Sequence, residues 1–135
     1  MSEKLYLGFI LAGVYNFSIL IFSKLFTNDL GKYDDLFNFN GVIMVILWGM
    51  AYISIYKNFR QVPFLNFVFF IEKMYFVIKW VTWMGKNSNN LNNIFKDDIL
   101  TGIFYTVYGI GDFVFGIFFL AMAISSFKRS SYNAL

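Results

Sequence analysis

The chain has 135 residues, of which 59% are hydrophobic and 14% are charged, whereas an average soluble domain is about 25% charged. It contains no cysteine and no histidine, which excludes disulfides, thiolate and imidazole metal sites, bis-histidine haem and Ser-His-Asp triads. We therefore expect no metal and no other cofactor. The formal charge is +3, but the basic residues are scattered singly at segment ends, so we expect no nucleic-acid partner.

Long apolar stretches dominate the chain. A bilayer core of roughly 30 Å needs about 20 apolar residues in a helix, and four stretches approach or exceed that length. In chain order they are residues 5–26, 39–56, 62–84 and 99–127. The first stretch is longer than the roughly 7–15 apolar residues of a signal peptide, and no A-x-A-like cleavage site follows it. We therefore expect it to remain as a membrane anchor.

These stretches predict an all-α fold: a single domain over residues 1–135 that forms an integral membrane bundle of four transmembrane helices. The connections, residues 27–38, 57–61 and 85–98, are short and leave no room for a second domain. Five basic residues flank the side that holds both termini, and four flank the other side. Because positive charge favours the cytoplasmic side, we expect both termini in the cytoplasm.

Polar side chains at the centres of these stretches are the informative exceptions, because a charge at mid-bilayer costs on the order of 2.5–3.5 kcal/mol. Glu72 and Lys73 lie at the centre of the third stretch, Asp112 at the centre of the fourth and Asn16 at the centre of the first. The four should therefore share one depth. We expect Asp112 to pair with Lys73, and Glu72 to find Lys79, a hydroxyl or a proton. Lys79 is expected to extend its stem toward the interface.

The fourth stretch carries two further features. Tyr108 precedes Asp112 by one helical turn, and a phenol at this spacing can donate a hydrogen bond to the carboxylate. Small residues also recur at strict intervals of seven, and form a seam where the backbone of a neighbouring helix could approach closely. The seam consists of Gly102, Gly109, Gly116 and Ala123.

Two interpretations of the polar layer are open. Asn16, Glu72, Lys73 and Asp112 could form a buried pocket or an ion path, in which the carboxylates exchange protons. Alternatively, the two anions and two cations within the spans sum to zero, and buried charges are often paired without any further role. The many aromatic residues favour a lipid-facing surface and interfacial belts over a ligand cage, because Tyr and Trp gather at membrane interfaces.

The second to fourth stretches place Gly41, Tyr52, Lys73 and Asp112 at positions that match a known family pattern. The segments GVIMVILWGMAYISIYKNFRQVPFLNFVFFIEKMYFVIKW and YGIGDFVFGIFF resemble a family of small four-helix bacterial inner-membrane proteins of unknown function. The chain departs from that pattern at Gly111, where the family has an asparagine. The resemblance implies four spans, a mid-membrane Lys–Asp pair and a bacterial inner-membrane location, but no activity.

For function, the sequence favours a non-enzymatic accessory or structural subunit of a membrane assembly, because the chain is small and has neither a soluble domain nor a catalytic triad. The alternative is a binder or transporter of a small hydrophobic or ionic ligand that uses Glu72 and Asp112. An enzyme acting on lipid or sterol by carboxylate acid/base catalysis has no supporting motif. The expected partners are membrane lipids and either membrane-protein subunits or further copies of this chain.

Overall fold

Helices make up most of the computed structural model, which describes residues 4–134. The α-helices are α1 (Tyr6–Phe17), α2 (Ile19–Phe22), α3 (Phe39–Ser54), α4 (Pro63–Asn87), α5 (Leu91–Asp97) and α6 (Ile99–Asn133). Short 3₁₀ turns lie between them: η2 (Leu30–Lys32), η3 (Asp35–Phe37), η4 (Phe59–Gln61) and η5 (Ser88–Asn90). No strand occurs in residues 4–134, so the prediction of an all-α chain with four long helical segments is confirmed.

The first helical segment is interrupted and ends earlier than its apolar length suggests. Ser18 separates α1 from α2, and its hydroxyl donates to the carbonyl oxygen of Tyr15 at 2.5 Å, a local bond that competes with regular helix pairing. After α2 the chain is left-handed for three consecutive residues, Lys24, Leu25 and Phe26, with φ values of 49°, 54° and 71°. Residues other than glycine rarely adopt this conformation, so the turn needs support from its neighbours.

Side chains from the start of α6 supply this support. Asn28 Nδ2 donates to the carbonyl oxygen of Phe22 at 3.0 Å and to Asp98 Oδ2 at 2.9 Å. Lys24 Nζ forms an ion pair with Asp98 Oδ1 at 3.2 Å, and the Thr101 hydroxyl donates to Asp98 Oδ2 at 2.7 Å. The hydrogen bond from Thr101 and, after it, the contact with Lys24 lower the pKa of the Asp98 carboxyl. The left-handed turn is thereby fixed to the α5–α6 junction.

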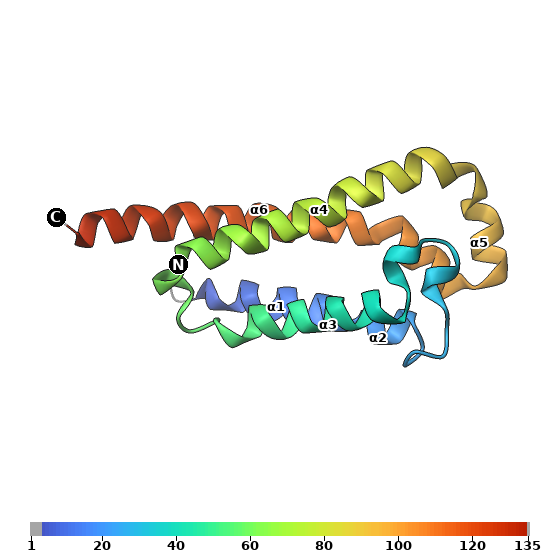
Figure 1. Ribbon diagram of the computed structural model, residues 1–135, viewed down its shortest axis with the longest axis horizontal. Coiled ribbons are helices and arrows are strands. Elements are labelled where there is room, and N and C mark those ends of the chain that lie inside the picture. Colours follow the sequence, from blue (N-terminus) through green and yellow to red (C-terminus); the bar gives the residue numbers. More distant parts are fainter. Residues whose placement is uncertain (1–3, 135) are drawn as a thin grey trace.

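The later helices begin at clear sequence signals. Asn38 caps α3, because its Oδ1 accepts a hydrogen bond from the N–H of Gly41 at 2.9 Å. Pro63 opens α4, where its missing N–H leaves no helical bond unmade. α6 has 35 residues and is therefore about 52 Å long at 1.5 Å per residue, longer than the expected span 99–127. It runs the length of the molecule and projects beyond α4 at the end where both chain ends lie (Figure 1).

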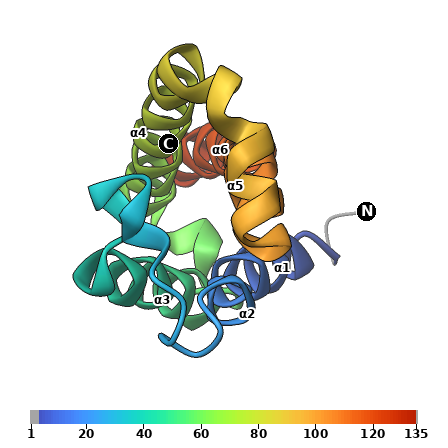
Figure 2. The same ribbon diagram turned by 90° about the vertical axis from the view of Figure 1, so that its right-hand side faces the viewer.

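The four long segments form two antiparallel pairs. α4 packs along α6, and α1 packs along α3, whereas the backbones of α3 and α4 stay apart. The end view shows α1 and α3 on one side and α4 and α6 on the other (Figure 2). Aromatic side chains bridge the two pairs: the Phe69 ring of α4 lies 6.1 Å from Trp48 and 4.8 Å from Tyr52, both on α3.

Two apolar clusters fill the space between the helices. The cluster near the α5 end includes Ile19, Phe37, Trp83, Phe104 and Tyr105. The cluster near the chain ends includes Phe9, Tyr52, Phe69 and Phe119. On α1, α4 and α6, buried polar side chains lie between the two clusters: Asn16, Glu72, Lys73 and Asp112. A polar layer therefore crosses the bundle at mid-height.

Among residues 4–134, α6 is the one helix that by itself is both long and apolar enough to cross a membrane, with a mean hydropathy of 2.0 over its most apolar window. Tyr6–Phe22 and Phe39–Ser54 are apolar but shorter, and α4 is long enough but carries Glu72, Lys73 and Lys79. By length and composition, one described helix could therefore cross a membrane without help from its neighbours.

Candidate functional site

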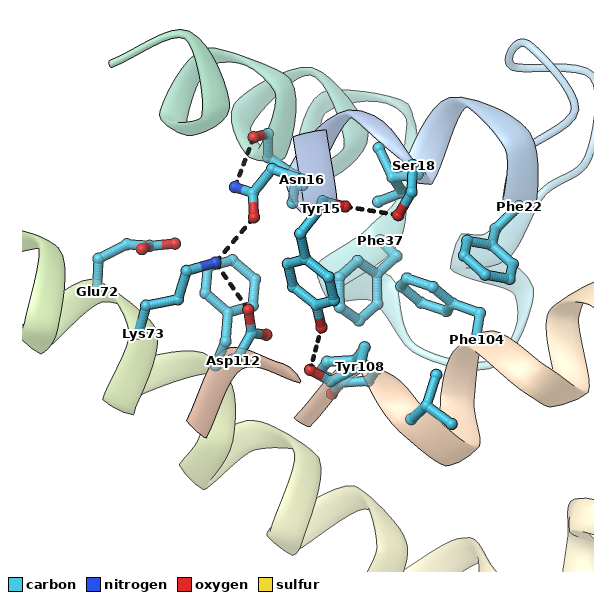
Figure 3. Close-up of a pocket in the computed structure, with 14 residues that line it drawn as sticks. Tyr15, Asn16, Ser18, Phe22, Phe37, Glu72, Lys73, Phe104, Tyr108 and Asp112 are labelled. Atoms are coloured by element: carbon cyan, nitrogen blue, oxygen red, sulfur yellow. Dashed lines mark hydrogen bonds and ion pairs between the residues drawn. The ribbon is translucent and has the colours of Figure 1, made fainter. Parts of the chain in front are cut away.

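Lys73 lies at the centre of the polar layer with only 1% of its surface exposed. Its Nζ donates to Asp112 Oδ1 of α6 at 2.8 Å and to Asn16 Oδ1 of α1 at 2.8 Å (Figure 3). The contact with Asp112 is a buried ion pair, and the contact with Asn16 joins α4 to the other helix pair. Because the two charges neutralise each other, neither is left uncompensated in the interior.

Asn16 is held in place by a bond of its own. Its Nδ2 donates to the carbonyl oxygen of Val45 on α3 at 2.9 Å, which leaves Oδ1 free to accept from Lys73. The close approach of α1 and α3 beside it depends on two glycines: a Cβ on Gly13 would lie 2.9 Å from the carbonyl oxygen of Gly49. The node at Lys73 therefore connects all four long helices.

Tyr15 belongs to this layer, although the sequence analysis did not single it out. Its hydroxyl donates to the carbonyl oxygen of Tyr108 at 2.5 Å, and Lys73 Nζ lies 5.3 Å from the centre of its ring, within cation–π range. A Cβ on Gly111 would lie 2.5 Å from the Tyr15 ring, so glycine makes room for the ring at this position. The available signal was a tyrosine far from either end of an apolar stretch, since tyrosine favours the interface.

Glu72 has a different kind of partner from Asp112. The hydroxyl of Tyr52 on α3 donates to Glu72 Oε2. The ion pairs among the described residues are Lys73–Asp112 and Lys24–Asp98, so Glu72 has no described lysine or arginine within 4.0 Å. The sequence predicted Lys79, a hydroxyl or a proton as the partner of Glu72, and the structure shows the hydroxyl of Tyr52.

A cavity lies beside this node, between the polar layer and the aromatic cluster near α5 (Figure 3). Its polar wall contains Asn16, Glu72, Lys73 and Asp112, and its aromatic wall contains Phe22, Phe37, Phe76 and Phe104. The space open to the centre of a water-sized molecule is about 40 Å³, whereas one water needs roughly 10–15 Å³. The cavity therefore has room for a few waters or a small polar group, but not for a large ligand.

Tyr108 also lines this cavity, and its hydroxyl lacks a hydrogen-bond partner among residues 4–134. The side chain is only 4% exposed. The hydrogen bond to Asp112 that its spacing suggested is not present in the structure. A buried hydroxyl without a partner costs roughly 1–3 kcal/mol, and a polar group that reached it from the cavity would remove that cost.

Lys79 lies outside the site. It is exposed on α4, and its Nζ lies 5.5 Å from the ring centre of Tyr75 on the same helix. It contacts neither Glu72 nor the cavity, because it lies two turns further along α4 and on the outer surface.

The seam of small residues on α6 faces side chains and not the backbone of a neighbouring helix. A Cβ would lie 2.5 Å from the Phe95 ring at Gly102, 2.1 Å from the Trp80 ring at Gly109 and 2.2 Å from Met74 Cε at Gly116, and Ala123 is 1% exposed. The seam therefore makes room for large side chains. Close backbone approach occurs instead between Gly13 and Gly49, which the sequence analysis did not single out.

Comparison with known proteins identifies no relative: no family model, no curated protein and no solved structure matches the chain. The resemblance to small inner-membrane proteins therefore remains a prediction.

Proposed function

We propose that the chain spans a lipid bilayer with its four long helical segments, and that the cavity at mid-height binds the polar group of a small ligand. The outer surface supports the membrane location. Large apolar side chains are exposed on every long helix, as Leu11 on α1, Met50 on α3, Ile78 on α4 and Val114 on α6 illustrate with 55–65% exposure. Apolar residues outside and charged residues inside are the distribution that lipid favours.

Two of the three mid-helix charges on α4 are compatible with a span when the bundle is considered as a whole. Glu72 and Lys73 are buried inside it, so lipid does not have to solvate them. Lys79 is exposed, and its long stem allows its charge to reach toward the interface. The resemblance adds the bacterial inner membrane as the proposed location, and the count of basic residues adds both termini in the cytoplasm.

Ligand binding is carried by one observation: Tyr108, whose buried hydroxyl has no hydrogen-bond partner among residues 4–134, lines the same cavity as the Lys73–Asp112 pair. A cavity with donors, acceptors and an aromatic wall is typical of small-molecule sites. A bundle that served only as a structural subunit would need the ion pair but not a buried hydroxyl left without a partner. The geometry thus favours the binder over the accessory subunit that the sequence alone favoured.

The test uses two valines of α6. Val107 lines the cavity, whereas Val114, two turns further on, is not in its lining, and their exposed fractions are 41% and 59%. The wild type and the variants Val107→Phe and Val114→Phe are purified in mild detergent, and small molecules released by denaturation are quantified per mole of protein by mass spectrometry.

We expect a molecule that co-purifies with the wild type and with Val114→Phe, and that is reduced at least about fivefold in Val107→Phe, because the larger ring occupies the cavity. Equal amounts in all three proteins, or none above a detergent blank, would contradict ligand binding. Stoichiometric co-purification of another membrane protein without such a molecule would favour the accessory subunit.

A further inference from the structure

A second, larger hollow lies on the side of the molecule, between α3 and α4. Met44 and Trp48 of α3 form one wall, and Val68, Ile71 and Tyr75 of α4 form the other. The space open to the centre of a water-sized molecule is about 460 Å³, within the range of roughly 300–1,000 Å³ typical of ligand sites. Met44, Ile71 and Tyr75 are each about half exposed, so the groove opens to the outside. In the proposed bilayer it faces the lipid chains.

Glu72 and Phe76 line both the groove and the inner cavity. They therefore form the partition between the two spaces. The groove is open along α3 and α4 because the backbones of these helices stay apart, while only side chains such as Phe69 bridge them. A molecule lying in the groove would thus reach Glu72 from the side of the bundle without passing through either end of it.

The sizes of the two spaces indicate a ligand with two parts. The cavity, with about 40 Å³, admits only a small polar group, whereas the groove has more than ten times that space and is lined mostly by apolar side chains. An aliphatic chain fits the groove, and a compact head group fits the partition. This division matches an amphiphile of the size of a single-chain lipid.

The carboxylate of Glu72, at the partition between groove and cavity, favours a ligand with a positively charged head group. Among the described residues that line the groove, Glu72 is the one carboxylate, and Trp48 and Tyr75 are the other residues with a polar side-chain atom. Lys73 is already paired with Asp112, and Glu72 has no cation within 4.0 Å among the described residues. A cation brought by the ligand would supply the missing counter-charge in a site of low dielectric constant.

We propose that the α3–α4 groove is a lateral binding site for a single-chain amphiphile with an amine head group, which Glu72 binds at the entrance to the cavity. This inference rests on the proposed function and names its ligand class. The amine donates to the Glu72 carboxylate beside the hydroxyl of Tyr52, and the chain lies between Met44, Trp48, Val68 and Ile71.

The experiment uses the full chain in phosphatidylcholine nanodiscs, with dodecylamine as the probe and dodecanol as its uncharged equivalent. Trp48 lines the groove, so its fluorescence, taken as the difference between the wild type and Trp48→Phe, reports on occupancy. We expect a saturable response to dodecylamine with an affinity at least about tenfold higher than for dodecanol, because a hydrogen bond to a charged group contributes this much or more.

Two variants and one control locate the site. Glu72→Gln keeps an acceptor for Tyr52 and should remove the preference for the amine. Val68→Phe narrows the groove and should lower the affinity for dodecylamine at least about tenfold. Val81→Phe adds the same ring to α4 at an exposed valine outside the groove lining and should bind as the wild type does. Thermal unfolding of each variant shows whether it is folded. If Glu72→Gln does not fold, the difference in dodecylamine affinity between Val68→Phe and Val81→Phe tests the site.

The inference is overturned if dodecylamine and dodecanol bind equally well to the wild type, or if Val81→Phe weakens binding as much as Val68→Phe does. If this happens while Val107→Phe still loses its co-purified molecule, the lateral amine site is wrong and the proposed function stands. If the co-purified molecule is also insensitive to Val107→Phe, both are wrong.

Discussion

The stability of the bundle depends on both members of the buried pair Lys73–Asp112. Each is almost fully buried, with side-chain exposures of 1% and 8%, and removal of one partner leaves the other uncompensated. We expect Lys73→Met and Asp112→Leu each to destabilise the bundle by about 3–5 kcal/mol. The double variant should be more stable than either single variant, because apolar replacement of a buried pair is often near neutral.

Thermal unfolding of the four proteins in one detergent measures this coupling as a double-mutant cycle. If the losses of the two single variants simply add in the double variant, the residues are not energetic partners despite their 2.8 Å contact. If stability is recovered but the small molecule no longer co-purifies, the pair also serves the ligand.

The sequence made part of this layer predictable. Lys73, Asp112 and Asn16 lie near the centres of long apolar stretches, and the cost of a buried charge then requires them to meet. The partner of Glu72 was harder to predict, because a hydroxyl on α3 and Lys79 on α4 satisfied the same requirement. Tyr15 could not be found in this way, because its contacts depend on the local absence of a Cβ at Gly111 and on the rotation of α1.

At the scale of elements, the turn after α2 is the least predictable part of the fold. Lys24, Leu25 and Phe26 adopt left-handed backbone conformations without glycine or asparagine, the residues that normally indicate them. The turn is instead supported by Asn28, two residues after it, and by Asp98 at the start of α6, which Asn28 and Lys24 contact. Sequence patterns are local, and a conformation imposed by a contact some seventy residues away leaves no local signal.

The same junction predicts a pH dependence of stability. The folded pKa of the Asp98 carboxyl is lowered, first by the hydrogen bond from Thr101 and then by Lys24. Its contribution is therefore present above the unfolded pKa of about 3.9 and is lost as the pH falls through the folded pKa. We expect Asp98→Asn to destabilise the protein by up to about 1 kcal/mol at pH 7, since Lys24 is half exposed and the pair is screened.

Thermal unfolding of wild type and Asp98→Asn between pH 7 and pH 3 checks this expectation, and the difference should shrink toward the acidic end. Asp29→Asn is the control, because Asp29 makes no side-chain hydrogen bond in the described part of the chain. A difference that stays constant down to pH 3 would show that the charge of Asp98 does not stabilise the fold.

At the scale of the whole molecule, the proposed membrane location makes a prediction about access. The chain has no cysteine, so a single introduced thiol is unique. Asn58 and Ser131 are exposed near the end that holds both chain termini, and Asn92 is exposed on α5 at the other end. In intact bacterial cells, a membrane-impermeant maleimide should label Asn92→Cys and leave Asn58→Cys and Ser131→Cys unlabelled until the cells are opened.

Labelling of all three positions in intact cells, or of none until the cells are opened, would rule out a bilayer between the two ends. The reverse pattern, with Asn58→Cys and Ser131→Cys labelled and Asn92→Cys protected, would keep the four spans and overturn only the orientation. The basic residues at the two ends are nearly equal in number, which is why the sequence predicts the spans more firmly than their direction.

The arrangement in two helix pairs also has a consequence for biogenesis. α1 and α3 are made before α4, so the first pair can assemble while the rest of the chain is still on the ribosome. In the proposed bilayer, α4 then enters the membrane ahead of α6, the helix that carries Asp112. During this interval the neighbouring Glu72 and Lys73 are opposite charges on one helix, and their sum at its midpoint is zero. On the proposed membrane location, we therefore expect the glutamate that later lies between groove and cavity to offset the charge of Lys73 during insertion, until α6 brings Asp112 beside that lysine.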